Sequence, residues 1–309
     1  MNQGGRLQNY YFHGFCLRSA IPLTTIPQWP TAQEDAALHL YYQPNYIPAT
    51  LEDPVWSTPF VQIGRDRSVL VTVSAVGRFW LPDGEHIYFE RTAEAQDYEL
   101  ETILAGSVAG LLFHQRRLLP LNASCVVLNG KAVALSGGSC IGKSALAAAL
   151  LRRGALLLAD DLCIAQKTSE EFGVAAATTH LRLWPDVLDK LEIASEQRLP
   201  TRLNHPCKAV PMNAAEAKLW PLSHLIRIVH DQSGAPSITA QRDISSLFPP
   251  KGLVFLREAL IQMKNLEVEF RGISEIGKNL QRFQLKHPSQ MEHYEACADL
   301  ILETVQEPQ

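Results

Sequence analysis

The chain has 309 residues, which is enough for one large domain or two of ordinary size. Its 28 Lys and Arg residues against 32 Asp and Glu residues give a formal charge of −4, and 46% of its residues are hydrophobic. This balance excludes a strongly basic nucleic-acid-binding surface and disorder over most of the chain, and a mean hydropathy near zero argues against a membrane protein.

The cysteines and the N-terminal segment indicate the cellular compartment in which we expect the protein. The six cysteines lie at least fifteen residues apart, so they form neither a CxxC motif nor a metal-ligand spacing, and we expect reduced thiols. The N-terminal segment has no long apolar stretch, and nowhere does the chain approach the roughly 18 consecutive apolar residues of a membrane helix. We therefore expect a cytoplasmic protein with neither a membrane nor a nucleic acid as partner.

Residues 1–95 are predicted to form a small β-rich domain. The strands Arg78–Leu81 and His86–Glu90 flank a Pro-Asp-Gly turn, and Val69–Ser74 is expected to be their partner strand. No run in this region has sustained helical periodicity. We expect this domain to recognise the substrate or a partner protein.

A helix is predicted from Tyr98 onward, because apolar side chains recur there on one helical face. Acidic residues stand early in this segment and basic residues late, as the helix dipole favours. The apolar face is formed by Leu100, Ile103, Leu104, Val108, Leu111 and Leu112. We place the start of the second domain, residues 96–309, just before this helix.

A β-hairpin and a glycine-rich loop are predicted next. Two apolar runs are joined by Asn129-Gly130, a dipeptide that tolerates the positive φ angles of a tight turn. The second run leads directly into residues 137–144, Gly-Gly-Ser-Cys-Ile-Gly-Lys-Ser, which fit G-x-x-x-x-G-K-[ST] at every fixed position. Ser144–Leu151 is predicted to be a helix, so the motif has the strand before it and the helix after it that it requires.

This motif predicts a phosphate-binding loop for ATP. Its backbone N–H groups converge on phosphate oxygens, and the N-terminus of the following helix adds a partial positive charge. Lys143 would reach the β- and γ-phosphates, and the Ser144 hydroxyl would ligate Mg²⁺. The residues expected to bind the nucleotide are Gly137, Gly138, Ser139, Cys140, Ile141, Gly142, Lys143, Ser144 and Ala145.

Two adjacent acids, Asp160 and Asp161, end the short buried strand predicted at Ala155–Ala159. From a strand beside the loop strand, one carboxylate would face Mg²⁺ and the other would accept a proton from an attacking hydroxyl. Adjacent acids also raise each other's pKa, which suits one of them to act as a base. The sequence therefore favours phosphoryl transfer to a hydroxyl.

The remainder of the chain is predicted to mix short strands and loops with two more helices. The better strand candidates are Leu181–Pro185 and His224–His230, and the helices are expected at 252–264 and 288–306. A basic cluster lies between these two strands and would either neutralise phosphate charge in the transition state or belong to a solvated loop. Its members are Arg198, Arg202, His205 and Lys208.

The segment SGGSCIGKSALAAALLRRGALLLADDLCIA resembles the core of HPr kinase/phosphorylase and its related kinases, in which a phosphate loop, a short helix and a strand ending in Ala-Asp-Asp recur. The resemblance is strong over residues 118–190. Flanking segments such as YFHGFCLRSAIPL and LRLWPDVLDKL are similar to the HPr-kinase-like proteins found beside lasso-peptide biosynthetic enzymes. The resemblance implies an α/β fold: a P-loop kinase domain of the HPr kinase and phosphoenolpyruvate carboxykinase type, with a small β-rich N-terminal domain.

The resemblance also implies roles for individual residues. Asp161 matches the acid that accepts the proton of the incoming serine, and Asp160 matches its partner acid, which with Ser144 would hold the metal. Asp186 is a candidate second metal ligand, because the family has an acid near this point; capping the helix Val187–Leu191 is the alternative.

Two departures from the family pattern narrow the expected activity. Where the family has a His in the sequence L-H-A-S, this chain has Asn122, which carries neither a charge nor a transferable proton. The chain also lacks the Lys-Pro-Gly-Arg loop of true HPr kinase, which argues against phosphorylase activity and against HPr as substrate.

HPr kinase is a hexamer, but the N-terminal domain differs here, so a homo-oligomer stays an open expectation.

The function expected from these features is an ATP- and Mg²⁺-dependent kinase that phosphorylates a serine hydroxyl of a peptide. By the resemblance, the favoured acceptor is the C-terminal Ser of a lasso precursor. One alternative is a kinase of free serine or another small hydroxylated molecule. The other is a nucleotide-binding regulator with little chemistry, which Asn122 makes credible.

Overall fold

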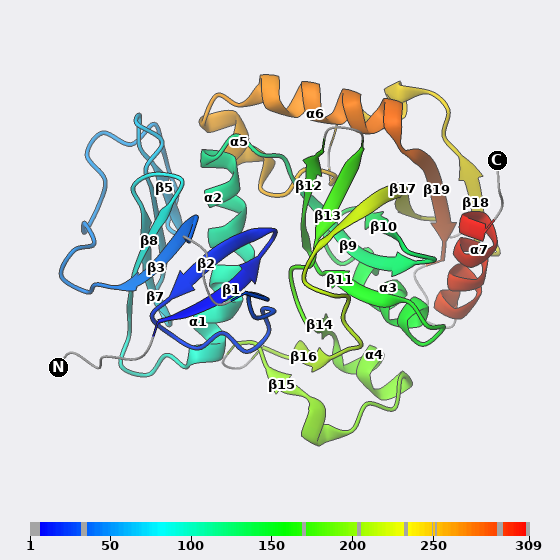
Figure 1. Cartoon of the computed structure of the whole chain (residues 1–309), viewed down its shortest axis with the longest axis horizontal. Helices are drawn as coiled ribbons and strands as arrows, with labels where there is room; N and C mark the ends of the chain where they lie inside the picture. Colours follow the sequence, from blue (N-terminus) through cyan, green and yellow to red (C-terminus); the bar gives the residue numbers. More distant parts are fainter. Residues whose placement is uncertain are drawn as a thin grey trace.

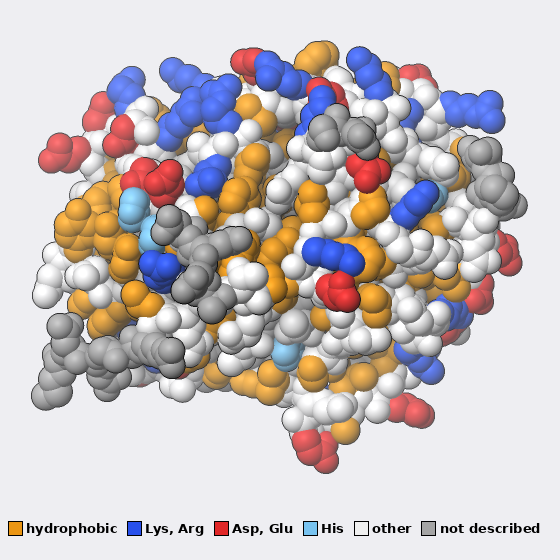
Figure 2. Space-filling model, viewed as in Figure 1, with side chains coloured by type: hydrophobic (Ala, Val, Ile, Leu, Met, Phe, Trp, Pro, Cys, Tyr) orange, Lys and Arg blue, Asp and Glu red, His pale blue; other side chains and the backbone are white. Residues whose placement is uncertain are grey.

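The computed structural model of the chain describes residues 7–31, 36–168, 171–202, 205–231, 234–248, 250, 252–288 and 293–306. In Figure 1 the N-terminal strands lie on the left with a helix against them, and the strands around the glycine-rich loop lie on the right. On the face shown in Figure 2, Lys and Arg side chains gather along the upper edge with Asp and Glu side chains among them.

The described part of the N-terminal region forms one eight-stranded sheet, in line with the β-rich structure expected there. The strand order is β1-β2-β3-β8-β7-β6-β5-β4, and only the β2–β3 and β3–β8 pairs are parallel. The predicted strands at 69–74, 78–81 and 86–90 are confirmed as β6, β7 and β8. The strands are β1 (Gln8–Phe12), β2 (Phe15–Ser19), β3 (Leu38–Tyr42), β4 (Trp56–Ser57), β5 (Val61–Ile63), β6 (Val69–Val73), β7 (Gly77–Leu81) and β8 (His86–Arg91).

The predicted helix after this sheet is confirmed and contains a π-helical turn. It runs as α1 (Asp97–Ile103), the π turn Leu104–Val108 and α2 (Ala109–Gln115). Its apolar face, with Leu104 and Leu112, packs in one core with sheet residues such as Phe79. A helix expected at the start of the second domain thus shares a core with the first, and the boundary at 95/96 stays a prediction.

The second region is built on a mixed sheet with the order β10-β9-β12-β13-β17-β19-β18. The long strand β17 pairs with β13 by its first residues and with β10 by later ones, so the pairings β9–β12–β13–β17–β10 close on themselves. Its strands are β9 (Pro120–Leu128), β10 (Lys131–Ser136), β11 (Leu156–Ala159), β12 (Leu162–Lys167), β13 (Phe172–Ala175), β17 (Leu219–His230), β18 (Ser237–Ala240) and β19 (Gln281–His287).

A three-stranded sheet lies below β11 and α3 (Lys143–Leu151) in Figure 1. It has the order β14 (His180–Leu183), β16 (Lys208–Pro211) and β15 (Leu199–Pro200). The strand expected at 181–185 therefore ends two residues early, because Pro185 begins the helix α4 (Pro185–Lys190). The hairpin β9–β10 turns at Asn129 and Gly130 with φ angles of 50° and 77°, as predicted.

Helices cover both faces of the mixed sheet. On one face, α3 (Lys143–Leu151) and α7 (Tyr294–Gln306) share a core with β10, β17 and β19. On the other lie α5 (Arg257–Gln262) and α6 (Leu266–Asn279), with the 3-10 turn η3 (Ile244–Leu247). The helix expected at 252–264 is shorter than predicted, because residues 252–256 form turns and Leu256 has a φ of +46°.

The helix expected at 288–306 is α7, and residues 289–292 lie outside the described part of the chain. In the part that the structure describes, no helix is both long and apolar enough to cross a membrane.

Candidate active site

The glycine-rich loop connects the end of β10 to the start of α3. Gly142, the residue before α3, has a φ of +98°, a conformation that side-chain-bearing residues adopt at a cost. A Cβ atom at Gly142 would lie 2.3 Å from the Tyr294 hydroxyl oxygen of α7. Both the backbone conformation and the close approach of Tyr294 therefore require glycine at this position of the motif.

Lys143 is the first residue of α3 and is buried within the loop. Its ammonium group donates hydrogen bonds to the carbonyl oxygens of Gly137 and Gly138, at 3.2 and 3.1 Å. Burial lowers the pKa of Lys143, and the charges of Asp161 and Asp160 oppose this shift. The lysine charge is thus held at the loop by backbone oxygens and faces two carboxylates.

Asp160 follows β11 and is held by three hydrogen bonds. Its Oδ1 accepts from the Ser144 and Ser124 hydroxyls, at 2.7 Å each, and its Oδ2 accepts from the backbone N–H of Arg182 at 3.0 Å. Burial, and then the neighbouring charge of Asp161, raise the pKa of Asp160. Because β14 and α3 both contact this carboxylate, it links the loop to the three-stranded sheet.

The expected position of β11 beside the loop strand is wrong. Both β10 and β11 pair with β9, on its opposite edges, so β9 lies between them. The Ser144 hydroxyl nevertheless reaches Asp160, and Ser124 of β9 stands between the two strands as the second donor. Strand order is a long-range property of the sheet, which adjacency in sequence does not determine.

Asp161 stands at the turn after β11 with a φ of +64° and a half-exposed side chain. Its Oδ2 lies 2.9 Å from Nη2 of Arg182. The Nε atom of the same arginine lies 3.9 Å from Oδ2 of Asp160. The sequence reasoning missed Arg182. The available signal was its place between the buried residues Leu181 and Leu183 in a strand, which sends its side chain to the opposite face.

A cavity of about 730 Å³ joins these groups. Trp184 and Leu256, both more than a third exposed, line its apolar parts with Phe255. The predicted residues that line it are Asn122, Ser139, Cys140, Gly142, Lys143, Ser144, Ala145, Asp161, Asp186, Arg202 and His205. Asp160 lies behind this wall, and Gly137, Gly138 and Ile141 are not among the lining residues.

The predicted basic cluster divides in the structure. Arg202 and His205 line the cavity, whereas Lys208 lies in β16 and does not. Arg198 donates to the carbonyl oxygen of Ile193 at 2.9 Å and pairs with Asp189 of α4, also at 2.9 Å. Two of the four residues therefore line the cavity.

Asp186 and Asn122 both line the cavity. Asp186 is the second residue of α4, and the cap position belongs to Trp184. Burial raises the pKa of Tyr294, which lines the same cavity, and the charge of Asp186 raises it further. The backbone N–H of Asn122, on β9, donates to the carbonyl oxygen of Leu253 at 2.7 Å, which fixes this residue beside the loop 252–256.

Comparisons with known proteins give distant structural similarity and no match to a family model or a curated sequence. A solved structure with similarity is the Hpr(Ser) kinase/phosphatase from Coxiella burnetii, aligned over 60% of this chain and 95% of that one, with 12% identity and a TM-score of 0.33. The chain is a mixed α/β protein, and its similarity to that kinase is distant.

Proposed function

We propose that this chain is an ATP- and Mg²⁺-dependent kinase that transfers the γ-phosphoryl group to a serine hydroxyl of a peptide. The observation that carries the proposal is the 2.7 Å hydrogen bond from the Ser144 hydroxyl to Asp160, formed where the glycine-rich loop, Lys143 and Asp161 meet. This arrangement offers the parts that phosphoryl transfer requires: phosphate donors, oxygen ligands for a metal and a base.

Nucleotide binding is supported by the loop and the helix after it. The nine-residue helix α3 presents its N-terminal N–H groups to the cavity, and Lys143 places a buried cation at the same point. Anions bind at helix N-termini because the unpaired N–H groups and the helix dipole favour negative charge. A triphosphate is the ligand that this combination favours.

The residues present also fit a magnesium ion. The oxygen atoms of Ser144 and Asp160 lie 2.7 Å apart; Ser144 and Asp186 line the cavity, and Asp160 lies directly behind Ser144. Mg²⁺ is typically held by one or two carboxylates together with phosphate oxygens and water. When bound, the ion would neutralise charge on the transferring phosphoryl group.

Asp161 is the proposed proton acceptor. Its carboxylate lies on the cavity wall and is held in place by Arg182 at 2.9 Å. In the proposed reaction the serine oxygen forms a bond to the γ-phosphorus, the bond from that phosphorus to the β–γ bridging oxygen breaks, and ADP leaves. The serine proton passes to Asp161, and Arg182 keeps the carboxylate oriented toward it.

A peptide acceptor is favoured over free serine by the lining of the cavity. Its exposed apolar residues Trp184 and Leu256 offer contact area to the side chains of a peptide, which free serine lacks. The narrower proposal of a lasso precursor ending in Ser depends on the sequence resemblance.

The test is phosphate transfer from labelled ATP with Mg²⁺ to a peptide ending in Ser and, separately, to free serine. We expect transfer to the peptide, and its loss in Asp161→Asn. Asp189→Asn is the matched control, because Asp189 pairs with Arg198 and does not line the cavity. Transfer to serine in preference to the peptide would favour the small-molecule kinase, and ATP binding with no transfer to any acceptor would favour the regulator.

A further inference from the structure

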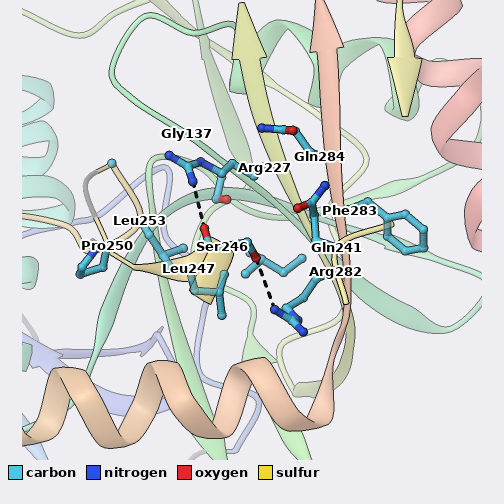
Figure 3. A pocket seen from close by; sticks show the side chains of 13 residues that line it. Gly137, Arg227, Gln241, Ser246, Leu247, Pro250, Leu253, Arg282, Phe283 and Gln284 are labelled. Carbon is cyan, nitrogen blue, oxygen red and sulfur yellow. Dashed lines mark hydrogen bonds between the residues drawn. The ribbon is translucent and has the colours of Figure 1, made fainter. Parts of the chain in front are cut away.

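A second cavity, of about 50 Å³, begins where β10 enters the glycine-rich loop (Figure 3). Ser136 and Gly137 line it at that end, and the side chains of Arg227 and Arg282 line it from β17 and β19. Its size is several times the roughly 10–15 Å³ that one water needs, which gives room for an ion with a few heavy atoms. Gly137 therefore belongs to both this cavity and the loop.

The polar lining of this cavity is rich in donors. Besides the two guanidinium groups it includes the side chains of Gln241, Gln284 and Ser246, and none of its described lining residues is an acid. In Figure 3 the two arginines approach Ser246 from different sides. Arg227 donates to the Ser246 carbonyl oxygen at 3.1 Å, the only hydrogen bond recorded for this side chain among the described residues.

Arg282 is a nearly buried cation, with 9% of its surface exposed, and forms no ion pair within the described residues. Its guanidinium donates to the carbonyl oxygens of Asp243 and Arg242, at 2.9 and 2.8 Å. The Asp243 carboxylate is turned to Ser245 instead, accepting from its N–H at 2.9 Å and from its hydroxyl at 2.6 Å. The hydrogen bonds of Arg282 go to neutral oxygens, and the nearby Asp243 charge is not in ion-pair contact with it, so the cost of burying this cation is only partly offset and the site favours an anion.

We propose that this cavity binds a small oxyanion, either inorganic phosphate or a short carboxylate, between Arg227 and Arg282. Guanidinium groups match the planar or tetrahedral oxygens of such ions, with charge-assisted hydrogen bonds. Free donors remain for this contact, because Arg227 has used one of its five N–H groups and Arg282 has three recorded contacts.

The bound oxyanion is coupled to the glycine-rich loop. Gly137 lines the cavity, and a Cβ atom at Gly252, another lining residue, would lie 3.1 Å from the backbone nitrogen of Gly138. An ion that shifts either contact changes the loop's affinity for nucleotide, and nucleotide changes the affinity for the ion by the same factor. This coupling depends on the nucleotide binding proposed above, whereas the oxyanion site does not.

The experiment measures the dissociation constants of sodium phosphate and sodium acetate by calorimetry on the full chain, at constant ionic strength with chloride as the balancing anion. We expect Arg227→Gln to weaken binding about tenfold, as for the loss of a charged hydrogen bond. Arg271→Gln, which removes the same charge from the exposed surface of α6, should leave binding within about twofold of the wild type.

The variant Lys143→Met distinguishes phosphate bound in this cavity from phosphate bound at the glycine-rich loop, because phosphate also fits the loop. Binding that survives Lys143→Met and is weakened by Arg227→Gln supports the site, for phosphate alone or for both ions. Binding lost in Lys143→Met but unchanged in Arg227→Gln, or no binding of either ion beyond chloride, would overturn it. Adding the anion should change the dissociation constant of ATP in the wild type, and this change should be about twofold larger than in Arg227→Gln. Equal changes in the two proteins would refute the coupling.

Discussion

The guanidinium of Arg182 lies 2.9 Å from the Asp161 carboxylate on the wall of the large cavity. The backbone N–H of Arg182 also holds Asp160, so one residue of β14 orients both acids. Replacing Arg182 by Gln removes the cation that pairs with Asp161 and releases this carboxylate from its position, with Lys143 as the remaining nearby cation. We expect kcat for phosphate transfer to fall by about 10²-fold, the size seen when one positioned electrostatic group is removed.

Arg198→Gln is the control for this change, because Arg198 forms a 2.9 Å ion pair with Asp189 away from the cavity lining. It removes the same charge and should change kcat by less than about twofold. Circular dichroism at rising temperature would show that both variants are folded. A normal kcat in Arg182→Gln would contradict the role given to this arginine.

Cys140 is the only exposed residue among the six free cysteines, all of which lie in the described part of the chain. It stands inside the glycine-rich loop and lines the large cavity. We expect iodoacetamide to modify Cys140 first, and the added group to block nucleotide binding because it occupies the space next to the loop N–H groups. Mass spectrometry of peptides and ATP titration would measure the two effects.

Bound ATP should protect Cys140 from this modification. Cys140→Ser supplies the control, since it should bind ATP as the wild type does and be unaffected by the reagent. ATP affinity that is unchanged after full modification of Cys140 would place the phosphates elsewhere.

Gly142→Ala should weaken ATP binding and destabilise the fold. The alanine Cβ would meet the Tyr294 hydroxyl at 2.3 Å on a backbone with a φ of +98°. The matched control is Gly154→Ala, because Gly154 has a φ of +93° and a Cβ there meets nothing within 4 Å. It isolates the backbone cost, which is about 1 kcal/mol.

We expect Gly142→Ala to lose about 1–3 kcal/mol beyond this control, the usual cost of an overpacked site. Urea denaturation measures the loss. Equal stabilities of the two alanine variants would show that Tyr294 moves aside freely.

Local chemistry explains what could be predicted from the sequence. The hairpin at Asn129-Gly130 and the glycine-rich loop depend on backbone conformations that few residue types adopt, so short motifs identify them. Arg182 could not be found in this way. The buried residues on either side of Arg182 indicate which face of the strand it takes, but its contacts with Asp160 and Asp161 join residues about 20 positions apart, and no local pattern indicates them.

The helix α6 shows a second limit. No helix is predicted here from the sequence, and its fourteen residues contain Gly272 and Gly277, which lower helix propensity. In the structure both glycines are close-contact points. A Cβ at Gly272 would lie 2.8 Å from a methyl group of Leu119, and one at Gly277 would lie 2.6 Å from Ile244. Tertiary packing requires the glycines, and this requirement is invisible in the local pattern.

His13 should make the fold sensitive to acid. It is 3% exposed between the rings of Phe12 and Phe113, its Nδ1 has no hydrogen-bond partner among the described residues, and burial lowers its pKa to about 3. In the unfolded chain a histidine titrates near 6.5, so below that pH the unfolded state binds the proton first. Stability from this group is therefore complete above pH ~6.5 and falls as pH decreases from ~6.5 toward 3.

The loss expected from His13 alone at pH 5 is about 2 kcal/mol relative to pH 7.5, measured by urea denaturation. His13→Asn should flatten this dependence, since Asn tolerates the φ of +53° at this position and does not titrate. The smaller side chain lowers stability at every pH, so the quantity to compare is the slope with pH. His86→Asn, at a half-exposed site beside Asp83, should keep the wild-type slope. If His13→Asn retained that slope as well, the acid sensitivity would come from other groups, of which buried His114, with a pKa lowered to about 4, is the next to test.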